Sequence, residues 1–239
     1  MPHGAVYLKD PELAQCIAGV MKNYPGPFQG VPGVLLPPAR TRGGNSGKAF
    51  RTFQDTPDPD RLTWVDWKIL RPIPFPNLIF GNPKLRKDLA TIAGQTRRAY
   101  ERIMEALDIP TPAPGRDATM IRLLHYPKID GSASREKPPT RMGAHIDTTD
   151  LTLLKFDQPG LTIIDNEGEY LVTPPETDEV LVLLGFQAAE KSGLPAPIHR
   201  ATQVGTGPRD VFTSFHGEIS RDMGRQMEAI RELIGDLTI

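Results

Sequence analysis

The chain has 239 residues, of which 38% are hydrophobic and 24% charged, a composition typical of soluble globular proteins. A formal net charge of −1 argues against a nucleic-acid-binding surface, and no apolar run approaches the roughly 18 residues of a membrane span. The single cysteine, Cys16, excludes an intrachain disulfide. Because the cytosol keeps thiols reduced, and because the first residues lack the apolar core of a signal peptide, we expect a cytoplasmic protein.

The first part of the chain predicts two helices separated by a segment rich in proline and glycine. Asp10-Pro11 marks the start of a helix, since Asp caps free backbone N–H groups and Pro is tolerated at the first helical position. This helix should end before Pro25. Residues 25–62 are rich in Pro, Gly and cations, and they predict either a lid over a site or a solvated basic loop. Asn82-Pro83 opens a second, amphipathic helix that runs to about residue 108.

From residue 118 onward, the sequence consists of short runs rich in Leu, Ile, Val and Thr, separated by turn residues. About seven such runs in about 100 residues predict an antiparallel sandwich or barrel. One of them, IIDNEGEYLV at 163–172, predicts a hairpin that bends at residues 166–168. We therefore predict one domain, mainly β with flanking helices. It comprises a helical and loop segment over residues 1–116, a β core over 117–217 and a closing helix over 218–239.

A histidine and an aspartate two positions apart are the first candidates for a metal site. His145 and Asp147 alternate with period two, which directs both side chains to one face of a strand. His199 begins a later predicted strand and could supply a third ligand. Two imidazoles and one carboxylate leave one face of a metal open, as non-haem iron(II) oxygenases require, whereas structural zinc sites more often use cysteines. The alternative is a hydrogen-bonded polar pair at a strand end.

Six stretches, in matching order and spacing, resemble the iron(II)- and 2-oxoglutarate-dependent oxygenases of the isopenicillin N synthase-like group. They are RLLHYP (122–127), GAHIDTTDLTLL (143–154), PGLTII (159–164), VLVLLGF (180–186), IHRATQ (198–203) and RDVFTSFHG (209–217). The resemblance covers about residues 117–217 and implies a double-stranded β-helix, or jelly-roll, core. For the first hundred residues, it extends only to a helical approach to the barrel.

The resemblance implies a role for several single residues. His145, Asp147 and His199 would bind iron(II), and dioxygen would be the oxidant. Arg209 would hold the distal carboxylate of 2-oxoglutarate, and Tyr126 would hydrogen-bond this co-substrate. The family usually has a serine two residues after that arginine, but this chain has Val211. The change removes one hydrogen bond, worth roughly 0.5 to 1.5 kcal/mol.

Residues that would choose the substrate are less defined. Arg122, Phe186 and Gln187 are candidates for the substrate pocket. Cations in residues 25–62 and 128–141 favour an anionic small molecule, such as an amino acid or another carboxylate metabolite, although solvated loops would carry the same charges. We expect a small-molecule substrate and neither a nucleic-acid nor a membrane partner.

Three functions follow from these patterns. The first is a dioxygenase of specialised metabolism, an oxidoreductase that hydroxylates, desaturates or cyclises a small molecule at an unactivated C–H bond with 2-oxoglutarate as co-substrate. The second, motivated by Val211, is an iron(II)-dependent oxidase or cyclase that does not use 2-oxoglutarate. The third is a non-enzymatic binding module on the same barrel.

Overall fold

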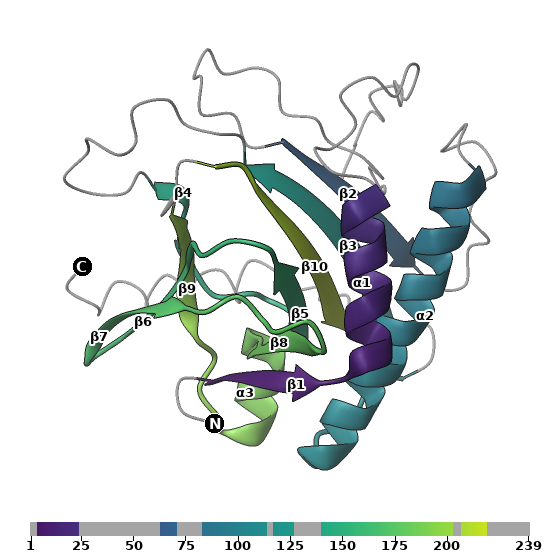
Figure 1. Ribbon diagram of the computed structural model, residues 1–239. Helices are drawn as coiled ribbons and strands as arrows, with labels where there is room; N and C mark the ends of the chain where they lie inside the picture. Colours follow the sequence, from purple (N-terminus) through teal and green to yellow (C-terminus); the bar gives the residue numbers. More distant parts are fainter. Residues whose placement is uncertain are drawn as a thin grey trace, which may run out of the picture.

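The structure, a computed structural model, describes residues 4–23, 63–70, 83–113, 117–126, 140–202 and 207–218 (Figure 1). Within these ranges, two antiparallel sheets face each other, and two long helices cover the outer face of the larger sheet. The predicted loop at 25–62 lies outside the described residues, as does nearly all of the predicted helix over 218–239. This mainly β architecture with flanking helices confirms the predicted fold class, including the jelly-roll core.

Both predicted helices of the first part of the chain are present. They are α1 (Pro11–Asn23) and α2 (Pro83–Ala106). Asp10 caps α1 as predicted, because its Oδ1 accepts a hydrogen bond from the backbone N–H of Leu13 at 3.0 Å. Apolar residues at helical spacing, including Ile17 of α1 and Ile92 of α2, are buried against the large sheet. None of the helices in the described ranges is long and apolar enough to cross a membrane.

The larger sheet has six strands in the order β1-β8-β5-β10-β3-β2. Their bounds are β1 (Ala5–Lys9), β2 (Thr63–Leu70), β3 (Asp117–Tyr126), β5 (Leu151–Phe156), β8 (Glu179–Leu184) and β10 (Arg209–Glu218). Alternate residues separate its two faces: Phe212 of β10 packs under the helices, whereas Val211 faces the second sheet. The central strand β5 is therefore buried along its whole length, which explains its nearly continuous apolar sequence.

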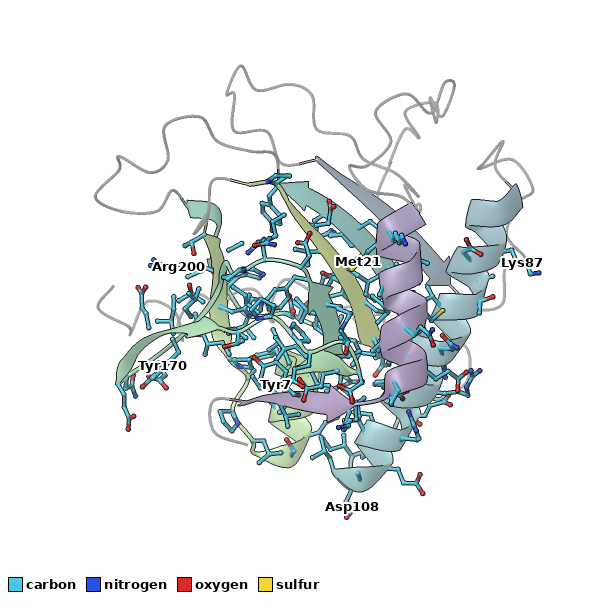
Figure 2. The ribbon with its side chains drawn as sticks, in the orientation of Figure 1. Tyr7, Met21, Lys87, Asp108, Tyr170 and Arg200 are labelled. Atoms are coloured by element: carbon cyan, nitrogen blue, oxygen red, sulfur yellow. The ribbon has the colours of Figure 1, made fainter. Side chains whose placement is uncertain are left out.

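The smaller sheet has four strands in the order β4-β9-β6-β7. Their bounds are β4 (Thr140–His145), β6 (Leu161–Asp165), β7 (Gly168–Val172) and β9 (Ile198–Thr202). The β6–β7 hairpin confirms the predicted bend, and Asp165 Oδ1 closes it by accepting hydrogen bonds from the backbone N–H groups of Glu167 and Gly168. Figure 2 shows Tyr170 on this hairpin, away from the core. A short helix, α3 (Phe186–Ser192), follows β8.

Two edge strands of the larger sheet were not predicted. β1 pairs with β8, and β2 pairs with β3, so parts of the segment 1–116 complete the sheet that carries the β core. The helices α1 and α2 thus cover a sheet to which their own flanking residues contribute strands.

Candidate metal centre

The structure brings the three predicted metal ligands together at one end of the space between the sheets. His145 ends β4 and is the register partner of His199 in β9, and their ring centroids are 4.3 Å apart. Asp147 lies in the following loop, with Oδ1 3.7 Å from His145 Nε2 and Oδ2 3.7 Å from His199 Nε2. The three donor atoms lie within 4.8 Å of one another. Pairing of β4 with β9 therefore supplies the juxtaposition that the sequence could only suggest.

Both histidines are oriented as a metal ligand needs, each by a backbone carbonyl beside its Nδ1. His145 Nδ1 lies 2.8 Å from the carbonyl oxygen of Gly143, and His199 Nδ1 lies 3.1 Å from that of Pro197. A carbonyl can only accept, so each Nδ1 is the donor, and Nε2 is the ring nitrogen that faces Asp147 and is available to a metal. Burial lowers the pKa of His199 below its usual value and so favours the neutral imidazole, whereas Asp147 acts in the opposite direction.

A threonine that the sequence analysis did not single out orients the aspartate. Thr152 Oγ1 donates a hydrogen bond of 2.6 Å to Asp147 Oδ2. Thr152 is fully buried in β5, so this hydroxyl has a fixed place. Residues that hydrogen-bond a ligating carboxylate set its orientation and raise metal affinity. The only signal for this role in the sequence is a threonine within the apolar run LTLL.

A cavity of about 390 Å³ opens beside the three ligands. Its walls come from β3, β5, β9 and β10, so it lies between the two sheets. Most of the lining is apolar, and includes Leu124, Leu154, Phe156, Leu161, Ala201 and Val211. The volume and the lining are those of a site for a small molecule.

Arg209 provides a buried positive charge in this cavity. It is 4% exposed and lies opposite Tyr126 in the pairing of β10 with β3, with its guanidinium carbon 4.2 Å from the centre of the tyrosine ring. Its Nε and Nη1 are buried and have no hydrogen-bond partner among the described residues. Burial lowers the pKa of this guanidinium, while Tyr126 and Asp157 act in the opposite direction. A buried cation with unused donors is costly unless an anionic ligand pairs with it.

Gly160 makes room for that guanidinium. A Cβ on Gly160 would lie 2.0 Å from Arg209 Nη1 and 2.4 Å from the carbonyl oxygen of Thr202. Its φ of 141° is also in the region that side chains rarely adopt. The glycine of the PGLTII stretch is thus a close-approach position, which the sequence analysis missed.

Of the three residues predicted for the substrate pocket, one lines the cavity and two are absent from its described lining. Arg122 lines the cavity, and its guanidinium carbon lies 5.5 Å from the centre of the Phe215 ring, which lines the cavity as well. Phe186 packs against Ile146 and is not among the described lining residues. Gln187 is also absent from that lining. Its side-chain Oε1 accepts a hydrogen bond from the backbone N–H of Glu218 at 3.0 Å, and its Nε2 donates to the carbonyl oxygen of the same residue at 3.1 Å. Arg200 pairs with Glu169 on the outside of the small sheet (Figure 2).

The donor set fits the groups that the resemblance implies. Two imidazole nitrogens and one carboxylate form a mixed nitrogen and oxygen set that suits iron(II) and leaves coordination positions open. The two unused donors of Arg209 in the same cavity, Nε and Nη1, suit a carboxylate, which a guanidinium can bind through two parallel hydrogen bonds.

Comparison with solved structures identifies the class of protein that has this fold. The chain is similar to a full-length Neurospora crassa protein in complex with alpha-KG and 5-formyluracil, with a TM-score of 0.67 and 20% identity over 91% of this chain and 75% of that one. For AtDAO1, a dioxygenase for auxin oxidation from Arabidopsis thaliana, bound to 2-oxoglutarate, the TM-score is 0.64 and the identity 15%, over 91% and 84%. For a 2OG-Fe(II) oxygenase family protein from Caulobacter crescentus, the TM-score is 0.54 and the identity is 21%, over 91% of this chain and 79% of that one.

The chain therefore has the fold of the 2-oxoglutarate- and iron(II)-dependent oxygenases, and the resemblance drawn from the six stretches is confirmed at that level. No family model matches the chain, and no curated protein matches it in sequence. The narrower resemblance to the isopenicillin N synthase-like group stays a prediction.

Proposed function

We propose that the protein is an iron(II)- and 2-oxoglutarate-dependent dioxygenase that oxidises an unactivated C–H bond of a small molecule. The observation that carries this proposal is the His145, Asp147 and His199 cluster in the same cavity as a buried arginine with unused donors. Iron(II) and 2-oxoglutarate, when bound, supply the activation of dioxygen, which none of the twenty side chains provides.

In this proposal, the residues of the chain bind, orient and exclude water. His145, Asp147 and His199 hold the metal through one face, and Thr152 fixes the aspartate. Arg209 pairs with the distal carboxylate of 2-oxoglutarate, supported by Tyr126 across the β3–β10 pairing. The apolar walls keep water from the reacting atoms, which strengthens each charged contact inside the cavity.

Arg122 lines the same cavity beside Phe215, and this second cation supports a small anionic substrate such as an amino acid or another carboxylate metabolite. The similar Neurospora crassa protein, whose structures hold thymine or 5-formyluracil, also binds a small molecule. Hydroxylation, desaturation and ring closure all start with removal of hydrogen from such a molecule. A cytoplasmic location and a role in specialised metabolism belong to the proposal as well.

Val211 favours a second candidate, an iron(II)-dependent oxidase or cyclase without 2-oxoglutarate. This residue lines the cavity two positions after Arg209, where a hydroxyl would contribute a hydrogen bond. The unused donors of Arg209 support the first candidate, because without an anionic co-substrate its buried Nε and Nη1 would have no hydrogen-bond partner among the described residues.

An anaerobic titration separates the two candidates. Iron(II) and then 2-oxoglutarate are added to the protein, the visible charge-transfer band of the chelate is followed, and succinate is measured after oxygen is admitted. We expect the band and succinate in the wild type, and loss of both in Arg209→Gln. Arg200→Gln is the matched control, since Arg200 points away from the cavity. Absence of the band and of succinate in the wild type would refute the use of 2-oxoglutarate.

A further inference from the structure

The loop that carries Asp147 is fixed from behind by a second, buried aspartate. Asp150 is fully buried and lies three residues after the metal ligand. Its Oδ1 accepts a hydrogen bond of 2.8 Å from Lys191 Nζ, and its Oδ2 accepts one of 2.9 Å from the Tyr100 hydroxyl. One carboxylate thus joins the ligand loop to α3 through Lys191 and to α2 through Tyr100.

The backbone of the same loop, residues 146–150, is held on both sides. The N–H of Asp150 donates to the carbonyl of His216 in β10 at 2.8 Å. The first N–H groups of α3 and the residue before it donate to the carbonyls of the loop: Phe186 to Asp147 at 2.8 Å, Gln187 to Thr149 at 3.2 Å and Gly185 to Asp150 at 2.7 Å. These bonds place the loop between the start of α3 and the end of β10.

Two glycines allow this close seating. A Cβ on Gly185 would lie 2.0 Å from the carbonyl oxygen of Thr149, and a Cβ on Gly217 would lie 2.6 Å from the backbone nitrogen of Asp150. Any side chain at either position would push the loop, and Asp147 with it, out of place.

Tyr100 is itself buried in the core, where its side chain joins α2 to the large sheet. Its ring stacks on that of His216, with centroids 5.2 Å apart and planes 13° from parallel. His216 Nδ1 lies 3.2 Å from Thr119 Oγ1, and its Nε2 lies 2.8 Å from Ser214 Oγ. Burial lowers the pKa of His216 to about 3, and burial beside Asp150 raises that of Tyr100, so the ring is neutral and the hydroxyl keeps its proton. Neither Tyr100 nor His216 is among the described residues that line the cavity.

We propose that Asp150 is a positioning residue for the metal ligand Asp147, with Tyr100 and Lys191 as its anchors. The inference rests on the proposed function, because it gives the network of Asp150, Tyr100 and Lys191 a role in metal binding. None of Asp150, Tyr100 and Lys191 is among the described lining residues, so the network acts on the metal through the loop that carries Asp147. A network that served stability alone would leave metal affinity unchanged.

Cobalt(II) titration, followed by the visible d–d absorption, tests the proposal without turnover. We expect Asp150→Asn to weaken cobalt(II) binding about 10- to 100-fold, the range for residues that orient metal ligands, and to shift the absorption bands. Tyr100→Phe and Lys191→Met should weaken binding in the same direction, and they keep the test open if Asp150→Asn does not fold. All titrations are run well below the thermal midpoint of each variant.

Lys155→Met is the matched control. Like Lys191, Lys155 joins two parts of the fold through its Nζ, although Lys155 is buried and Lys191 is exposed. Its Nζ donates to the carbonyls of Glu176 and Glu179, at 2.7 and 2.8 Å, and not to the ligand loop. We expect it to lower the thermal midpoint and to leave cobalt(II) affinity within about twofold of the wild type. The inference is overturned if Lys191→Met and Tyr100→Phe lower the midpoint as Lys155→Met does, with cobalt(II) affinity and bands unchanged. A wild type that binds no cobalt(II) would instead refute the metal centre itself.

Discussion

Replacing Gly160 by alanine should weaken the binding of 2-oxoglutarate through Arg209. The new Cβ would lie 2.0 Å from Arg209 Nη1 and 2.4 Å from the carbonyl oxygen of Thr202. The guanidinium can move, but the Thr202 carbonyl is part of the β9 backbone, so the arginine is the group that is displaced. Hydrogen bonds to a charged group contribute about 1.5 to 3 kcal/mol. Their loss corresponds to roughly a 10- to 150-fold increase in the dissociation constant.

Gly168→Ala is the control that isolates this contact. Gly168 has a φ of 143°, nearly the same as the 141° of Gly160, but a Cβ there would meet nothing within 4 Å. Both variants should lose about 1 to 3 kcal/mol of stability from the backbone conformation alone. Isothermal titration of the cobalt(II)-loaded proteins with 2-oxoglutarate then compares their affinities. Equal affinities in Gly160→Ala and Gly168→Ala would refute the role of Gly160 in placing the arginine.

Three further predictions concern single residues. Thr152→Val should weaken cobalt(II) binding at least about tenfold, because Asp147 loses its 2.6 Å hydrogen bond, and an unchanged dissociation constant would contradict this role. Val211→Ser should tighten 2-oxoglutarate binding by about 0.5 to 1.5 kcal/mol, roughly 2- to 13-fold in calorimetry, if the added hydroxyl reaches the co-substrate. Burial lowers the pKa of His216 to about 3, so this residue takes up a proton more readily in the unfolded chain. The free energy of unfolding should therefore fall between about pH 6.5 and 3 by up to roughly 1.4 kcal/mol per pH unit, and urea titrations of His216→Phe should show a flatter dependence.

The parts of the fold that the sequence predicted are those encoded by local patterns. The cap at Asp10, the helical spacing of α1 and α2 and the turn at residues 166–168 all lie within a few residues of what they determine. The two edge strands were missed because their pairing is non-local. β2 carries the strand-like run TWVDWKIL, but this run lies in a proline-rich part of the chain and pairs with a strand some 50 residues later.

In the candidate site too, the residues that could be predicted are those marked by a local pattern. Period-two spacing drew attention to His145 and Asp147, and the later strand with His199 completed the set. His145 ends β4, however, so the loop after it and not strand alternation places Asp147. Thr152, Gly160 and Asp150 were missed because their roles depend on which atoms meet after the sheets have formed. For Gln187, the sequence indicated a role that the structure does not place in the cavity. This residue directly follows a motif residue, yet its side-chain amide is hydrogen-bonded to the backbone of Glu218.

Strand β9 fixes the distance between the two ends of the proposed co-substrate site. His199 lies near its start, and Thr202, beside which the guanidinium of Arg209 is seated, is its last residue. Three residues of extended strand span about 10 Å, and β9 is paired on both sides, with β4 and with β6, so this length cannot easily change. We therefore expect the chain to select oxo-diacids by length. A four-carbon or six-carbon homologue would be too short or too long to contact the metal and the arginine at the same time.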